Sequence, residues 1–207
     1  MLIGLLLSLL GLYGCGGRPP KLEAIYDRVV SLIEDSYELN AIFYGEGLPY
    51  YDRNSPVYQS LYSDYTISQY TQNYNIVNRN AKYGSVEEIK MAAEQVYTKE
   101  LLEQTVYPSV FVGLISTDLG SASHISKARY LQGEDDLYIL IDNGENPAPT
   151  PPLVYDYASM KIVRPSNASR VLISINAWEE SAPDQIIQEQ ITLARVNGVW
   201  YLDSLTV

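Results

Sequence analysis

The spacing of the apolar residues changes along the chain, and this change constrains the fold more than any other feature. Between residues 21 and 43 apolar side chains recur every three or four positions, which is typical of a helix with one buried face. From Ala128 onward they alternate or form short runs between turn residues, which is typical of strands. Helices followed by strands with short turns predict an α+β fold, with amino-terminal helices packed on a curved antiparallel sheet meander.

The boundaries of several elements can also be predicted. Ser85 and Glu88 in SVEE form a capping box, which indicates the start of a helix with Val86, Ile89, Ala93 and Val96 facing inward. Thr98 is a second expected N-cap, for a helix over residues 99–105 that Pro108 would stop. The other expected elements are helices over 21–43 and 55–62, an extended piece over 74–77, and strands over 137–141, 153–163, 170–178, 185–196 and 199–207, the last two joined by an Asn197-Gly198 hairpin turn.

Composition limits the class of protein. Hydrophobic residues make up 46% of the 207 residues and charged residues 19%, which are globular values that argue against disorder. The length suits one domain with a sizeable core that needs no disulfide. The formal net charge of -11 argues against a nucleic-acid partner and predicts a surface that repels anionic lipid headgroups.

The chain begins with the apolar stretch MLIGLLLSLLGLY, followed by GCGGRPP. The stretch is shorter than the roughly 20 residues that span a bilayer, and it is typical of the apolar core of a secretory signal. The glycines and prolines that follow predict a flexible tether. They also disfavour the alternative, a free cysteine buried in an amino-terminal core helix, because glycine and proline break helices.

The four residues Leu12-Tyr13-Gly14-Cys15 resemble the bacterial lipobox. This resemblance implies export, attachment of a diacylglyceryl group to the sulfur of Cys15, and cleavage before Cys15. The expected organisation is therefore a lipoprotein signal peptide over 1–14, a lipidated tether over 15–20 and a single α+β domain over 21–207, held at the outer face of the bacterial cytoplasmic membrane. Cys15 is the only cysteine, so its lipidation would leave the domain without a thiol.

The order of the elements resembles that of lipoproteins of the nuclear transport factor 2-like (cystatin-like) superfamily. The residues that carry this likeness are Gly198-Val199-Trp200-Tyr201-Leu202-Asp203, which are similar to the terminal strand of many such domains. Residues 85–102, which contain VYTKEL, also resemble a segment of secreted Gram-positive inhibitors of cell-wall DL-endopeptidases. The superfamily holds enzymes and non-enzymes, so the fold alone does not select a function.

Few residues suggest catalysis. His124 is the only histidine and lies in a polar stretch, so we expect an exposed loop residue rather than part of a triad or a zinc site. The acidic clusters Glu134-Asp135-Asp136 and Glu179-Glu180 could supply paired carboxylates about 5–10 Å apart for glycoside hydrolysis, or calcium ligands. Solvated turns at strand ends are the favoured interpretation. The sequence therefore predicts no catalytic residue, metal or cofactor, and leaves open whether the chain is an enzyme.

Tyrosine is abundant, with 19 residues against 2 phenylalanines. Aromatic rings with polar tips suit sugar- or peptide-binding faces, although they can also cover a core with their hydroxyl groups in water. The leading hypothesis is a non-enzymatic envelope lipoprotein that binds a wall component or an envelope protein. The alternatives are an inhibitor of a cell-wall peptidase with a basic cleft, and a carboxylate-dependent envelope hydrolase. The candidate binding residues are Tyr44, Tyr50, Tyr51, Tyr58, Tyr62 and Tyr65.

Overall fold

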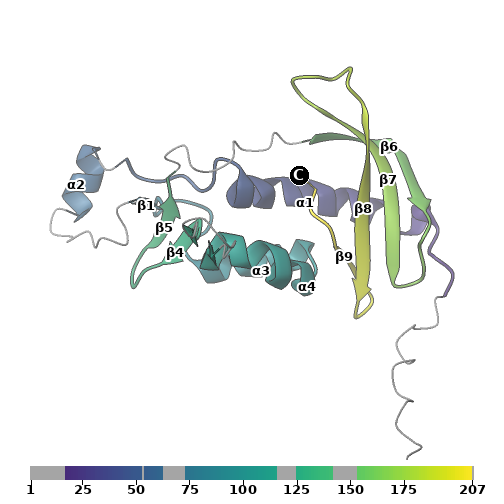
Figure 1. The fold of residues 1–207 in the computed structure, drawn as a ribbon, viewed down its shortest axis with the longest axis horizontal. Helices are drawn as coiled ribbons and strands as arrows, with labels where there is room; N and C mark the ends of the chain where they lie inside the picture. Colours follow the sequence, from purple (N-terminus) through teal and green to yellow (C-terminus); the bar gives the residue numbers. More distant parts are fainter. Residues whose placement is uncertain (1–16, 53, 63–72, 116–124, 142–152, 207) are drawn as a thin grey trace, which may run out of the picture.

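The computed structural model describes residues 17–52, 54–62, 73–115, 125–141 and 153–206, and it confirms the α+β class. Figure 1 shows the arrangement of the elements. The helical elements are η1 (Leu22–Ala24), α1 (Tyr26–Tyr44), α2 (Pro56–Tyr62), α3 (Val86–Val96), α4 (Lys99–Leu101), η3 (Leu102–Val106) and η4 (Pro108–Val112). The strands are β1 (Tyr74–Ile76), β2 (Leu114–Ile115), β3 (Ile125–Ser126), β4 (Tyr130–Gln132), β5 (Leu137–Leu140), β6 (Leu153–Val163), β7 (Arg170–Glu179), β8 (Ile187–Val196) and β9 (Val199–Leu202).

Strands β6 to β9 form a four-stranded antiparallel sheet in sequence order, as the predicted hairpin turn requires. Alternate side chains of each strand face the core, because successive residues of a strand point to opposite faces. In β7 these are Val171, Ile173 and Ile175, and their neighbours across the sheet are Leu193, Ile191 and Glu189. The predicted last strand over 199–207 is shorter than expected and ends at Leu202.

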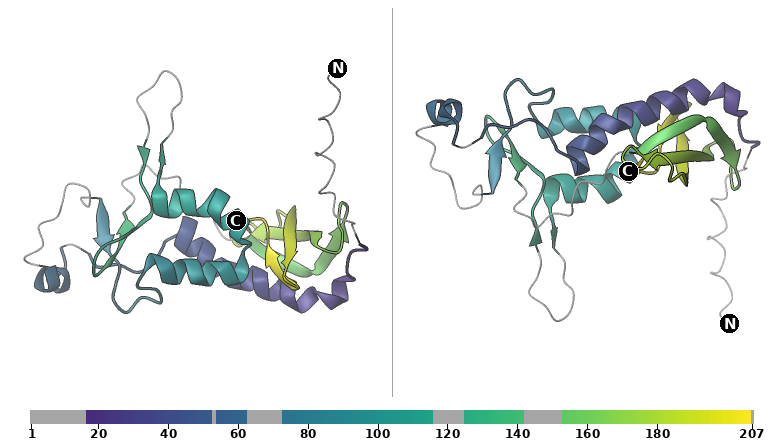
Figure 2. Two further views of the ribbon diagram at one scale, coloured as in Figure 1. Left: turned by 90° about the horizontal axis from the view of Figure 1, so that it is seen from below. Right: turned by 90° about the horizontal axis from the view of Figure 1, so that it is seen from above.

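Helix α1 joins the two ends of the molecule. It lies against the inner face of the four-stranded sheet and continues beyond the sheet toward β1, β4 and β5 (Figures 1 and 2). Its buried stripe, which follows the predicted three-four spacing, consists of Val29, Leu32, Ile33, Ser36, Leu39, Asn40, Ile42 and Phe43. The apolar members of this stripe belong to one hydrophobic core that includes residues of α3, β5 and β7. Within the described ranges, no helix combines the length and hydropathy needed to cross a bilayer.

The sheet meander is confined to residues 153–202. Strand β5, which the sequence identifies as a strand, pairs instead with β1 and β4 in a separate three-stranded sheet. Tyr74 lies opposite Leu140, and Tyr130 lies opposite Ile139. The alternation of buried residues in β5 shows which face meets the core, but such a pattern does not specify the neighbouring strand.

The helical segment after α3 begins as predicted but ends later. The Ser85 and Thr98 side chains accept hydrogen bonds from the amides of Glu88 and Leu101, which confirms both N-caps. The prediction that Pro108 stops this segment is wrong, because residues 102–112 form wide π-helical turns that continue to Val112. A five-residue turn moves the hydrogen-bond partners away from the proline ring, so the ring is accommodated. The segment ends at Gly113, which has a φ of 83°.

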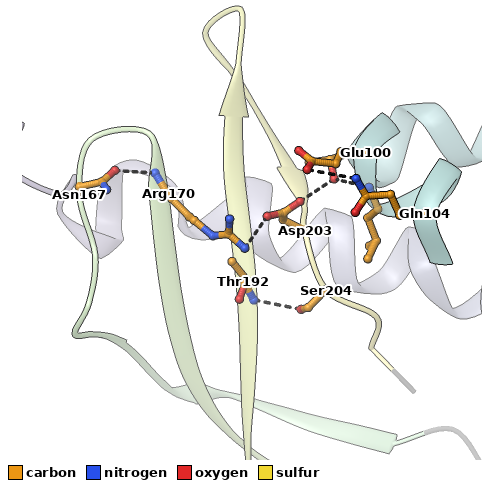
Figure 3. Close-up of polar contacts among 9 residues, drawn as sticks. Glu100, Gln104, Asn167, Arg170, Thr192, Asp203 and Ser204 are labelled. Atoms are coloured by element: carbon orange, nitrogen blue, oxygen red, sulfur yellow. Dashed lines mark hydrogen bonds and ion pairs between the residues drawn. The ribbon is translucent and has the colours of Figure 1, made fainter. Parts of the chain in front are cut away.

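Asp203 connects the end of β9 to strand β7 of the same sheet and to the helical layer (Figure 3). One carboxylate oxygen forms an ion pair with the Arg170 guanidinium at 2.8 Å, and the other accepts a hydrogen bond from the Thr98 hydroxyl at 2.6 Å. Because Arg170 begins β7 and Thr98 caps α4, a single carboxylate ties two strands of the sheet to the helical layer. The Asp203 side chain is only 13% exposed, so this contact is largely sheltered from water.

Candidate functional site

The candidate tyrosines from the sequence do not form a single surface. Tyr51 and Tyr58 come together, with Ile76 and Tyr138, in a small apolar cluster beside the three-stranded sheet. Tyr58 is 8% exposed, and the Tyr51 hydroxyl accepts a hydrogen bond from the Arg79 amide at 3.3 Å. These contacts hold α2 and the segment before it on the small sheet.

The remaining candidates lie apart from this cluster. Tyr44 ends α1, and its ring meets Phe43 edge-on with centroids 6.1 Å apart. Burial raises the pKa of the Tyr44 hydroxyl, and a hydrogen bond with Ser109 partly opposes that effect. Tyr50 is 44% exposed. The side chain of Tyr62 and the whole of Tyr65 lie outside the described part of the chain. Among the candidates, Tyr50 therefore offers the most accessible described ring.

A second tyrosine group lies between α1 and β6, and the sequence analysis did not identify it as a group. The Tyr37 hydroxyl donates a hydrogen bond to the Leu153 carbonyl at 2.8 Å, and the Tyr37 and Tyr155 rings lie 6.3 Å apart. Burial raises the pKa values of Tyr37, Tyr155 and Tyr157, and the charge of Glu34 raises those of Tyr37 and Tyr157 further. The available signal was the three-four spacing of apolar residues in α1, which places Tyr37 beside the buried stripe and indicates packing rather than ligand binding.

The two acidic clusters are far from one another. Asp136 lies in the β4–β5 turn, is 6% exposed and forms an ion pair with Arg79 at 3.5 Å. Glu179 and Glu180 lie at the β7–β8 hairpin, which projects from the four-stranded sheet, apart from the small sheet (Figure 1). The two clusters therefore do not form a carboxylate pair across a cleft. His124 lies outside the described residues, and within them no group of three or more His, Cys, Asp or Glu side chains is placed to hold a metal ion.

The start of the described chain is fixed to one end of the four-stranded sheet. The Gly17 carbonyl accepts a hydrogen bond from the Ala168 amide at 3.0 Å, in the loop between β6 and β7. A Cβ atom on Gly17 would lie 3.1 Å from the Ala168 Cβ, so the close approach favours glycine. Cys15 lies outside the described residues, two positions before this contact.

A surface pocket of about 280 Å³ lies beside this contact. It is lined by Arg18, Pro20, Ala24, Ile25, Ala168, Arg195 and Trp200. The Arg195 guanidinium donates a hydrogen bond to the Gly198 carbonyl at 3.1 Å and lies 5.9 Å from the centre of the Trp200 ring. The Arg18 side chain makes no hydrogen bond or ion pair with another described residue. The pocket therefore presents two guanidinium groups next to the point where the tether enters.

Comparisons with known proteins add no family to these observations. No protein-family model matches the chain, and the curated proteins contain no significant match.

Proposed function

We propose that the chain is an exported lipoprotein of the bacterial cell envelope. Lipid on Cys15 would hold it at the outer face of the cytoplasmic membrane, and its domain, of nuclear transport factor 2-like (cystatin-like) type, would bind a wall component or an envelope protein without catalysis. The residues Leu12-Tyr13-Gly14-Cys15 support the anchor, because a small residue before a single cysteine fits lipid attachment followed by cleavage.

The observation that carries this proposal is the separation of the two candidate regions. The tether contact at Gly17 lies at one end of the long axis, and α2 with the Tyr51–Tyr58 cluster lies toward the other (Figures 1 and 2). Helix α1 runs along this axis from the four-stranded sheet toward the small sheet (Figure 1), and its 19 residues correspond to about 28 Å at 1.5 Å per residue. A domain anchored at Cys15 would thus present Tyr50 and the small sheet away from the membrane, toward the wall.

A second candidate function, inhibition of a wall-degrading peptidase, is favoured by the β7–β8 hairpin. This hairpin carries Glu179, Glu180 and Asp184, and it exposes Ile186 and Ile187 by 62% and 43%. An acidic hairpin with aliphatic side chains suits a basic cleft with an apolar subsite, because opposite charges steer association and apolar contacts stabilise the complex.

The anchor is tested with Cys15→Ser in the producing bacterium. We expect the variant to lose incorporation of labelled palmitate and to leave the membrane fraction. The matched control is Ser8→Ala, which changes a small polar residue in the same leader and should keep both properties. Membrane retention and labelling of Cys15→Ser equal to those of the unmodified protein would overturn the lipoprotein assignment.

Binding is tested separately with purified protein and wall sacculi. Retention on sacculi that falls in Tyr50→Ala supports wall binding at the small sheet, with Tyr201→Ala, on the four-stranded sheet, as the control. Capture of a wall hydrolase from an envelope extract, with slower lysis of the wall, would instead support the inhibitor. Release of sugar or peptide fragments from sacculi by the protein alone would contradict both.

A further inference from the structure

Basic side chains gather at the end of the four-stranded sheet to which the tether is fixed. Antiparallel pairing places the β6–β7 loop beside the β8–β9 turn, and the Arg195 amide donates to the Ser169 carbonyl at 2.7 Å between them. We define the basic end as five exposed residues of this region: Arg18, Lys21, Arg164, Arg170 and Arg195. The chain has only 14 Lys and Arg residues and a net charge of -11, so this distribution is uneven.

The acidic groups near the basic end leave it with a positive charge. Asp203 is the acidic residue on the sheet there, and it is engaged with Arg170 at 2.8 Å. On the neighbouring helical segments, Glu23 and Asp27 are exposed. Five basic groups thus face three acidic groups in this part of the described chain. The net charge of the whole chain predicts repulsion of anionic lipid, whereas the local excess of basic groups predicts attraction at this end.

An apolar tip projects from the same end. Val196 and Val199 lie opposite each other on either side of the Asn197-Gly198 turn. They are 47% and 45% exposed, although aliphatic side chains are stabilised by leaving water. Arg195 directly precedes this tip, so two aliphatic side chains are bordered by a guanidinium group. Apolar side chains bordered by basic ones suit the interfacial layer of a membrane, because apolar burial and attraction to anionic lipid then act together.

We propose that this end of the molecule docks on an anionic phospholipid bilayer. The two valines enter the interfacial layer, and the basic end, including the two arginines of the pocket, contacts the headgroup phosphates. Each basic residue close to an anionic surface strengthens binding by a factor of about five. This contact adds a second membrane signal to the lipid on Cys15, and it fixes the orientation of the domain with the small sheet pointing away.

Tether length makes this contact compatible with the proposed anchor, on whose membrane address the inference rests. Cys15 lies two positions before Gly17, and an extended chain of that length spans at most about 7 Å. Gly17 is bonded to Ala168 at 3.0 Å. A lipidated Cys15 would therefore keep the basic end within roughly one Debye length of the headgroups, where the charges are not fully screened.

The contact is tested with the full chain carrying Cys15→Ser, so that the result does not depend on acylation. Asn197→Cys at the β8–β9 turn carries an environment-sensitive fluorophore, and Ser181→Cys at the β7–β8 hairpin carries the same fluorophore as the matched control. Both are added to vesicles of phosphatidylcholine and to vesicles in which about a third of the lipid is phosphatidylglycerol. We expect a severalfold rise in fluorescence for the Asn197 probe alone, on the anionic vesicles alone, that high salt reverses.

Charge variants then identify the basic end as the cause. Arg18→Gln, Arg164→Gln and Arg195→Gln together should abolish the response of the Asn197 probe. Removal of three positive charges elsewhere, with Lys82→Gln, Lys99→Gln and Lys127→Gln, should preserve it, and circular dichroism confirms that both variants fold. A response that is equal on both vesicles, equal for both probes or unchanged in the arginine variant would overturn the docking contact. The palmitate experiment on Cys15 fails or succeeds independently of this outcome.

Discussion

The two ends of the four-stranded sheet are alike in apolar exposure and opposite in charge. At the tether end the β8–β9 turn exposes Val196 and Val199 by 47% and 45%, and at the far end the β7–β8 hairpin exposes Ile186 and Ile187 by 62% and 43%. The first pair borders the basic end, and the second shares its hairpin with three acidic residues. Exposed aliphatic side chains alone therefore do not identify the surface that meets a membrane, because the sign of the neighbouring charge decides which partner is attracted.

The ends also differ in how they are attached to the rest of the protein. At the tether end, Asp203 connects β9 to Arg170 and to the Thr98 cap. At the far hairpin the described hydrogen bonds of Ser181 and Ala182 are local ones, to Glu179 at 3.3 and 2.9 Å. A change at the tether end should thus reach the core, whereas a change at the far hairpin should remain local.

The largest expected effect is loss of stability in alkali. Tyr97, which precedes α4 and bridges to Leu202 of β9, is 1% exposed, and its hydroxyl donates to Asn40 at 2.7 Å. Burial raises the pKa of Tyr97 to about 12, from an ordinary value of 10.0, against the opposing effect of its hydrogen bonds. The unfolded chain therefore loses this proton at lower pH than the folded protein. The resulting contribution to stability, about 3 kcal/mol, is complete below pH 10 and disappears as the pH rises to about 12.

The two tryptophans allow this effect to be located. Trp200 lies in β9 and Trp178 lies in β7 next to the far hairpin, so Trp178→Phe and Trp200→Phe give proteins with one reporter each. We expect the emission of Trp200 to change at lower pH than that of Trp178, because β9 is the strand that contacts Tyr97. Tyr97→Phe should reduce the pH dependence of the free energy of unfolding. Coincident transitions of both reporters would show that the two ends are not attached differently.

The next effect in size comes from the Asp203 connection itself. Asp203→Ala removes the ion pair and the acceptor of the Thr98 hydroxyl, and we expect a loss of about 2 kcal/mol in the free energy of unfolding. Asp203→Asn keeps an oxygen acceptor and should lose less. Glu179→Ala, the matched change at the far hairpin, should remain within about 0.5 kcal/mol. Urea denaturation measures all three, and equal losses for Asp203→Ala and Glu179→Ala would contradict the difference in attachment.

Sequence patterns predicted local structure better than they predicted which strands pair with one another. The caps at Ser85 and Thr98 and the Asn197-Gly198 turn depend on residues close in the chain, and all three are confirmed. The pairing of β5 with β1 depends on residues about 64 positions apart, for which alternation carries no signal. The prediction that Pro108 ends the helix was wrong, because the energetic penalty of proline applies to the interior of a regular α-helix and this segment has wider turns.

The candidate site shows the same difference between contacts of residues close in the chain and contacts of residues far apart. Tyr51 and Tyr58 are seven residues apart and meet beside the small sheet, but Tyr44 packs elsewhere, since the end of α1 faces η4. The basic end could not be predicted, because its members come from residues 18–21, 164–170 and 195, which only the pairing of β6 with β7 and of β7 with β8 brings together. The net charge of -11 is a sum over the whole chain and does not show where the positive charges lie.

The smallest expected effect concerns the turn that carries the apolar tip. Asn197 and Gly198 have φ values of 50° and 89°, and a Cβ atom added to Gly198 would meet nothing within 4 Å. Gly198→Ala therefore introduces backbone strain without a steric clash, and we expect a loss of about 1 kcal/mol in the free energy of unfolding. Asn197→Gly should cost only a few tenths of that, because glycine adopts a positive φ freely.

Gln185→Ala in the far hairpin is the control, and it should be neutral in the same urea denaturation. A loss for Gln185→Ala as large as that for Gly198→Ala would show that the tight turn does not distinguish the two ends. A loss for Gly198→Ala together with no loss for Gln185→Ala would identify the left-handed turn as the feature that holds Val196 and Val199 side by side at the tip.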